Sequence, residues 1–176
     1  THSSHISSRL DLRKAILLGA TRPVLMNELS AETAAFFMKA PDNNVLEFAL
    51  ARRVLLVEGD AEFILIEAFY HRLYGRAPED DGVHIIAIGG TSFRRYLELA
   101  RLLENRVAAL RDNDGNYQQN CDERYADVLC SRSRVFADHD NSRSTFEICL
   151  YQDNADLCDA LFRGTRRTLT VQDYML

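Results

Sequence analysis

The sequence has 176 residues, 21 of them Lys or Arg and 26 Asp or Glu, so its formal net charge at pH 7 is −5. A protein that holds nucleic acid by charge alone should be basic, which excludes that class unless cations neutralise a carboxylate cluster. No apolar run approaches the roughly 18 residues that span a bilayer, and the polar start has no signal-peptide pattern. We therefore expect a cytoplasmic globular protein with no membrane partner.

Four cysteines are spread over the second half of the chain, at Cys121, Cys130, Cys149 and Cys158. None belongs to a C-x-x-C pair, which argues against a zinc site. Nothing marks the chain as secreted, which argues against a disulfide framework. We expect ordinary reduced thiols.

The first third of the chain is predicted to be a short tail followed by a helical segment. Residues 28–51 have helical periodicity with a break at 40–44, around Pro41. Ser30 stands where a helix N-cap is expected. We interpret residues 1–22 as the end of a larger preceding domain and residues 23–52 as a helical linker.

From residue 53 onward, apolar strands alternate with helices. Residues 54–57 are an unbroken apolar run, typical of a strand buried on both faces, and residues 83–88 are predicted to be a second buried strand, with a helix between them at 61–74. The series continues with a helix to about 104, a strand at 106–110, a helix to about 129, a strand near 134–137, a strand or helix start at 144–150 and a helix at 153–162. This alternation predicts an α/β fold with a mainly parallel sheet of about four strands.

Acidic residues follow two of the predicted strands. Glu58 ends the first strand, with Glu62 one helical turn further on, and Asp112 and Asp114 follow the third strand. In parallel sheets, ligands gather beyond the carboxyl ends of the strands. Converging carboxylates repel one another without cations, and hard oxygen ligands suit Mg²⁺ or Mn²⁺. We therefore predict a divalent-metal site there.

Each acidic motif taken alone has a simpler interpretation as a turn. A Glu-Gly pair after a strand is common, and Asn, Asp and Gly all favour turns. Here both motifs end apolar strands of one series, and the strand between them ends in Gly89-Gly90, where backbone can approach a ligand. This combination favours a shared site over two unrelated turns.

These motifs resemble a known family. The run from Val54 to Gly59, together with Asp112-x-Asp114, resembles the Toprim fold of topoisomerases, primases and recombination nucleases. The finer resemblance is to the OLD (overcoming lysogenization defect) family, and within it to the second class, which includes the nuclease of the Gabija anti-phage system. It rests on Glu58-Gly-x-x-Glu62, Ile88-Gly-Gly-Thr-x-Phe93 and Asp112-Asn-Asp114-Gly.

The resemblance implies a Toprim (Rossmann-like) nuclease domain over residues 53–176 that hydrolyses DNA phosphodiester bonds with two Mg²⁺ or Mn²⁺ ions. Glu58, Asp112 and Asp114 would hold one ion, and Glu62 would help to hold the second. Glu147, in Thr145-Phe146-Glu147, resembles the Glu that completes the second site. The general base is then expected to be a water molecule whose pKa the ion lowers, not a side chain.

The N-terminus carries a weaker resemblance. Thr1-His2-Ser3 is similar to the switch-histidine motif of ABC-type ATPase domains, which precede the Toprim domain in OLD proteins. It implies that residues 1–22 are the end of such a domain, that ATP acts only through that missing domain, and that the full-length protein dimerises through it. A helicase encoded nearby is a further implied partner. The chain departs from the family in having no Lys after Lys39.

Two alternatives stay open at this point. One is another Toprim nucleotidyl-transfer enzyme, such as a primase or topoisomerase module, although the sequence has no primase zinc motif. The other is a non-catalytic module whose carboxylates hold a structural metal or only cap turns.

Arg94 and Arg95, shortly after Gly90, either contact DNA phosphate or form a solvated helix face.

Overall fold

The structure is a computed structural model that describes residues 16–19, 21–39 and 45–163. It divides into two compact units, which we call the first unit (residues up to 110 together with 124–136) and the second unit (111–123 together with 137 onward). Thr1-His2-Ser3 and most of the expected ATPase remnant lie outside the described residues.

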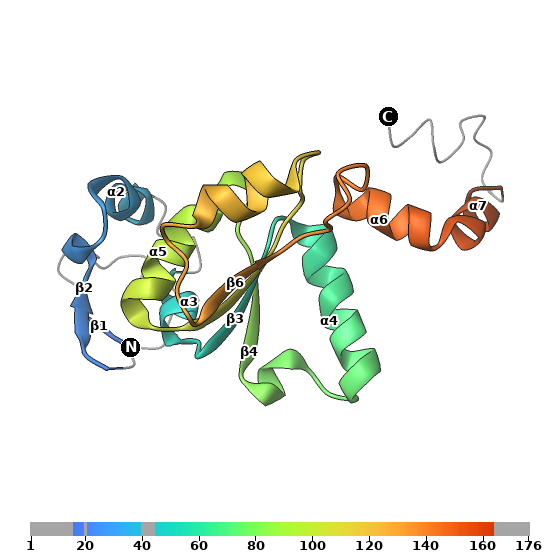
Figure 1. Ribbon diagram of the computed structural model, residues 1–176. Helices are drawn as coiled ribbons and strands as arrows, with labels where there is room; N and C mark the ends of the chain where they lie inside the picture. The colour runs from blue at the N-terminus through green and yellow to red at the C-terminus, as the bar shows by residue number, and fades with distance from the viewer. Residues whose placement is uncertain (1–15, 20, 40–44, 164–176) are drawn as a thin grey trace. The chain divides into compact units, whose positions relative to one another are not determined.

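A four-stranded sheet forms the centre of the first unit (Figure 1). Its strands are β3 (Arg53–Val57), β4 (Val83–Ala87), β5 (Arg106–Leu110) and β6 (Ser133–Phe136). They lie in the order β4-β3-β5-β6, and every neighbouring pair is parallel. The structure therefore confirms the predicted α/β fold with a parallel sheet of four strands.

Two helices cover opposite faces of this sheet. α4 (Asp60–Tyr74) follows β3, and α5 (Phe93–Leu103) follows β4 on the other side (Figure 1). Two short 3₁₀ turns, η3 (Pro78–Asp81) and η4 (Gly90–Ser92), connect these elements. Alternate strand residues such as Leu56 and Ala109 are fully buried on the α5 face, as the period of two requires.

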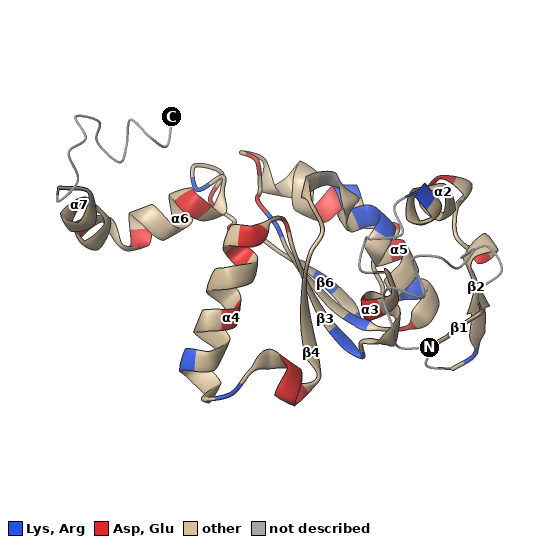
Figure 2. Cartoon of the chain, turned by 180° about the vertical axis from the view of Figure 1, so that it is seen from behind, with Lys and Arg blue, Asp and Glu red and all other residues tan. Residues whose placement is uncertain are grey.

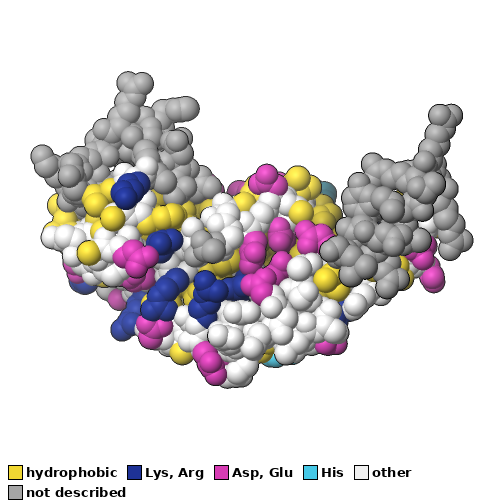
Figure 3. Space-filling view, turned by 90° about the horizontal axis from the view of Figure 1, so that it is seen from above, with side chains coloured by type: hydrophobic (Ala, Val, Ile, Leu, Met, Phe, Trp, Pro, Cys, Tyr) yellow, Lys and Arg dark blue, Asp and Glu magenta, His cyan; other side chains and the backbone are white. Residues whose placement is uncertain are grey.

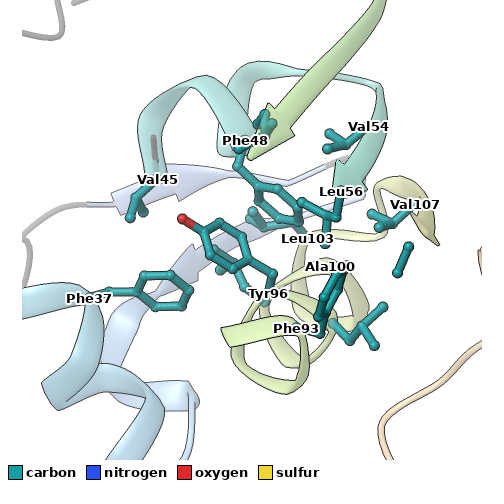
Figure 4. Packing of buried hydrophobic residues seen from close by; sticks show 14 of the residues in the cluster. Phe37, Val45, Phe48, Val54, Leu56, Phe93, Tyr96, Ala100, Leu103 and Val107 are labelled. Carbon is teal, nitrogen blue, oxygen red and sulfur yellow. The ribbon is translucent and has the colours of Figure 1, made fainter. Parts of the chain in front are cut away.

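The N-terminal segment shares its core with the sheet. It comprises β1 (Ile16–Leu18), β2 (Pro23–Leu25), η2 (Met26–Glu28), α2 (Ala31–Lys39) and α3 (Val45–Leu50). Phe37 and Phe48 each meet the ring of Tyr96 edge-on, with centroids 5.2 Å apart, and all three are buried (Figure 4). The two predicted helices agree with α2 and α3, and the predicted break at 40–44 lies outside the described residues. The predicted domain boundary at residue 52 stays a prediction.

One predicted helix is wrong. The segment to residue 129 forms a π-helical turn, η5 (Gln118–Asp122), and a 3₁₀ turn, η6 (Glu123–Tyr125), instead of a regular helix. Polar side chains compete locally for the backbone: Asn116 Oδ1 accepts a hydrogen bond from Gln119 N (3.1 Å), and Asn120 Nδ2 donates to Asn113 O (2.9 Å). Such side chains offer the backbone an alternative to the helical ladder.

The second unit also contains two helices, α6 (Phe146–Asp153) and α7 (Ala155–Arg163). The Thr145 hydroxyl caps α6 by accepting a hydrogen bond from Ile148 N at 3.3 Å, so the ambiguous stretch 144–150 is a helix start. All four cysteines are free thiols, as predicted. Within the described ranges, each helix is too short or too polar to cross a membrane.

Candidate metal site

In the first unit, the candidate ligands Glu58 and Glu62 lie where β3 ends and α4 begins. Glu62 is in the first turn of the helix and is 7% exposed. Its Oε2 accepts a hydrogen bond from the backbone N–H of Gly59 at 3.2 Å. Figure 2 shows acidic residues at this end of α4, where the partial positive charge of a helix N-terminus stabilises carboxylates. Glu58 is half-buried at the strand end itself.

Backbone hydrogen bonds also join the end of β4 to the end of β3. Ile88 N donates to Val57 O at 3.0 Å and Gly89 N to Glu58 O at 2.9 Å, so the hydrogen bonds between the two segments continue past the end of β4. Gly89 and Gly90 both have positive φ, 65° and 60°, a conformation that glycine adopts without steric cost. The predicted Gly-Gly strand end is therefore a backbone requirement of this turn.

In the second unit, Asp112 and Asp114 lie on one tight loop after β5. Asp112 Oδ1 accepts a hydrogen bond from Phe146 N at 2.8 Å, which ties the loop to the start of α6. Asp114 and Gly115 both have positive φ, 50° and 77°, and Asn116 N donates back to Asn113 O at 3.0 Å. Two consecutive left-handed residues inside an i to i+3 bond form a type I′ turn.

Asn113 is the buried hub of this loop, at 1% exposed. Its Nδ2 donates to three backbone carbonyls of the neighbouring loop, and its Oδ1 accepts from Gly115 N at 2.7 Å. The three acceptors are the carbonyls of Asp138 (2.9 Å), Asp140 (3.0 Å) and Arg143 (3.2 Å). The sequence motifs assign no role to Asn113, although its position between Asp112 and Asp114 could have drawn attention to it.

Arg111 is a second residue that sequence reasoning missed. Its side chain is buried, its Nε donates to Asp112 O at 2.6 Å, and its Nη2 forms an ion pair with Asp114. Because an arginine stays protonated in proteins, the carboxylate loop contains a built-in positive charge. Sequence patterns for metal sites are built from ligating side chains, so they do not single out an arginine at this position.

Arg143 organises the loop of residues 138–143, whose carbonyls accept the hydrogen bonds from Asn113. This guanidinium contacts Asp138 at 2.6 Å and Asp153 at 2.8 Å. The pKa of Asp138 is lowered, first by the hydrogen bond from Asp140 N and then by Arg143, and Arg143 also lowers the pKa of Asp153. His139 lies on the surface of this loop, with its ring 4.0 Å from that of Tyr117.

Glu147 is exposed in the first turn of α6, next to the Phe146 whose N–H binds Asp112. The second unit thus brings the segment carrying Glu147 to the Asp112 loop. In the part of the chain that the structure describes, no three His, Cys, Asp or Glu side chains gather closely enough to hold a metal. The expected ligands Glu58, Glu62, Asp112, Asp114 and Glu147 therefore stay a prediction. As carboxylates, they are of the donor type that Mg²⁺ and Mn²⁺ prefer.

The arginines considered for phosphate binding have carboxylate partners within the first unit. Arg94 pairs with Asp127 and lowers the pKa of that carboxyl, and Arg95 pairs with Glu32 at 2.8 Å. Figure 3 shows basic side chains of this face with acidic ones among them. These intramolecular pairs offset positive charge on this face, and a contact of Arg94 or Arg95 with DNA phosphate stays a prediction.

A comparison with protein families adds an independent finding. Residues 50–114 match the family model described as "Overcoming lysogenization defect protein-like, TOPRIM domain". The match confirms the resemblance for this stretch, which contains Glu58, Glu62, Asp112 and Asp114 and ends before Glu147. No curated protein and no solved structure matches the chain.

Proposed function

We propose that this chain, whose residues 50–114 are a Toprim region of the OLD-like kind, is the DNA-cleaving module of a larger ATPase–nuclease. A Toprim region indicates a metal-binding module for nucleotidyl transfer or nucleic-acid cleavage. The finer assignment, hydrolysis of DNA phosphodiester bonds with two Mg²⁺ or Mn²⁺ ions, is our proposal. The observation that carries it is the pair of acidic ends that follow β3 and β5 within the matched region.

The sheet supports this proposal through its strand order. β3 and β5 are parallel neighbours, and Leu56 stands opposite Ala109 close to the end of each strand. The chain leaves β3 directly at Glu58, and Asp112 follows the last residue of β5 by two positions. Both acidic segments therefore begin within two residues of the ends of neighbouring parallel strands.

We assign the carboxylates as the resemblance implies: Glu58, Asp112 and Asp114 to one ion, Glu62 and Glu147 to the second. When bound, two divalent ions supply the positive charge that stabilises the attacking and leaving oxygens of a phosphodiester. The protein's own contribution is orientation. Glu62 is held by Gly59 N and Asp112 by Phe146 N, so each carboxylate has a fixed direction before an ion arrives.

The test is cleavage of supercoiled plasmid by the chain with Mg²⁺, Mn²⁺, Ca²⁺ or EDTA, alongside Glu58→Ala and Asp112→Ala. Nicking or linearisation with Mg²⁺ or Mn²⁺ is expected, with a loss of at least about 100-fold in either variant, because a lost ligand removes charge stabilisation from the transition state. Glu67→Ala is the matched control, since Glu67 is an exposed carboxylate on the same helix as Glu62.

Two other results would lead elsewhere. Metal binding by calorimetry without cleavage would favour a non-catalytic module, and nucleotidyl transfer on added templates would favour a primase-like enzyme. Loss of cleavage in Glu67→Ala as well would mean that the variants act through the fold and not through metal ligation.

The wider setting of the module is also proposed. DNA is the substrate, ATP acts through a separate N-terminal domain, and the full-length protein dimerises and works with a helicase in defence against phage. These statements rest on the family resemblance. The same plasmid assay with the full-length protein, with and without ATP and the candidate partner, tests the roles of ATP and of the helicase.

A further inference from the structure

Arg111 occupies an unusual place for a cation, at the base of a loop that is expected to bind metal. Its side chain is 6% exposed, whereas that of its partner Asp114 is 56% exposed. Two separate contacts fix the guanidinium: Nε donates to Asp112 O at 2.6 Å, and Nη2 pairs with Asp114 Oδ2. The same side chain therefore contacts the backbone carbonyl of Asp112 and the carboxylate of Asp114.

The loop has a positive charge of its own even without metal. Asp112 and Asp114 are two residues apart, and Asp114 lies in the type I′ turn that runs from Asn113 to Asn116. Asn113 fixes the loop further through its buried hydrogen bonds. Two carboxylates on one short loop repel each other, and a nearby cation offsets that repulsion. Arg111 supplies that charge and, being buried, is poorly screened by solvent.

We propose that Arg111 is the resident counter-ion of the Asp112–Asp114 loop and competes with a divalent ion for the carboxylate of Asp114. This role rests on the proposed function, because it requires that the loop bind metal. Arg111 stabilises the metal-free protein and weakens metal binding, since the incoming ion must displace the guanidinium from Asp114 or share the carboxylate with it. Arg111 is then a positioning residue that sets the metal concentration at which the site fills.

The alternative is a purely structural arginine that only holds the loop in shape. The two roles predict opposite effects on metal affinity. If Arg111 is only structural, removing its charge loosens the loop and weakens both the fold and metal binding. If Arg111 competes with metal, removing its charge weakens the metal-free fold and strengthens metal binding.

The experiment is isothermal titration of Mn²⁺ into the metal-free chain, paired with thermal unfolding of the same samples. Arg111→Gln should lower the Tm of the metal-free protein and tighten Mn²⁺ binding by about tenfold, because a nearby positive charge no longer opposes a divalent ion. Arg111→Lys keeps the charge but loses the two-point contact, so its affinity should fall between the two. Arg72→Gln, at an exposed position ten residues after Glu62 on α4, removes one positive charge elsewhere and should change neither quantity.

Each result has one meaning. Mn²⁺ binding by Arg111→Gln that is equal to or weaker than that of the unchanged chain overturns the competition. If Arg111→Gln does not fold, Arg111→Lys decides: tighter binding supports the proposal, and equal or weaker binding overturns it. If neither the unchanged chain nor Arg111→Gln binds Mn²⁺, the proposed metal site fails and this role of Arg111 fails with it.

Discussion

The first unit carries its acidic residues on an apolar frame, whereas the second unit carries them in a network of polar contacts. In the first unit, Glu58 and Glu62 adjoin a parallel sheet whose α5 face buries large side chains such as Phe93 and Leu103. In the described residues of the second unit, buried apolar side chains are limited to Cys121, and the buried groups that matter are Arg111 and Asn113.

Because of this difference, the two units should respond differently to substitutions. An apolar core stabilises through buried area and is sensitive to cavities, but not to the loss of one polar contact. A polar network stabilises through matched donors and acceptors, so one removed partner leaves several groups unsatisfied. We therefore expect changes of pH and single polar substitutions to destabilise the loop that carries Asp112 more than the segment that carries Glu58 and Glu62.

The largest expected effect is on the apolar frame. Phe37→Ala removes a fully buried ring that packs on Tyr96 and should lower the free energy of unfolding by about 3 to 5 kcal/mol. Urea unfolding followed by circular dichroism measures this loss. Leu73→Ala, at a side chain 75% exposed, should cost less than about 0.5 kcal/mol. A loss below about 1 kcal/mol for Phe37→Ala would mean that α2 is not part of the core.

The next effect sharpens the comparison inside the second unit. Asn113→Ala leaves three carbonyls without their donor and should cost about 2 to 3 kcal/mol. Amide hydrogen exchange should rise throughout residues 138–143. Asn154→Ala removes one exposed hydrogen bond, to Leu150 O, and should cost about 0.5 kcal/mol. Equal losses in the two variants would contradict the role of Asn113 as the hub.

The smallest effect is that of pH on the same loop. Because the pKa values of Asp138 and Asp153 are lowered in the folded protein, both contribute stability above their unfolded pKa of about 3.9. That stability is lost as the pH falls through the lowered folded values. Hydrogen exchange of residues 138–153 should therefore rise below about pH 4 before that of the β3 and β5 strands.

A matched variant tests the cause of this pH effect. In Arg143→Gln, the pKa values of Asp138 and Asp153 should rise towards ordinary values, that of Asp153 more completely because Asp138 keeps its hydrogen bond from Asp140 N. Carboxyl carbon shifts in an NMR titration measure both. Unchanged values in the variant would show that Arg143 is not the source of the shift at Asp153.

The sequence predicted the sheet well because each of its strands has a local signal. Runs such as 54–57 and 107–110 are apolar throughout, as strands buried on both faces must be, and Gly59 or Asp112 follows two residues after the end of the run. The β1–β2 hairpin was not predicted, since two strands of three residues carry too little periodicity. The predicted helix to residue 129 failed because apolar spacing alone does not register the competing asparagine side chains.

For the candidate site, the sequence by itself determined the residue types and the strands they follow, and with them the Toprim resemblance that the family match confirms. Only the tertiary structure decided what holds these residues. The hydrogen bonds from Asn113 to three carbonyls and from Phe146 N to Asp112 join positions 25 to 34 residues apart in the chain. Local patterns report on neighbours a few residues away, whereas polar networks depend on which loops the fold brings together, so no spacing rule could have predicted them.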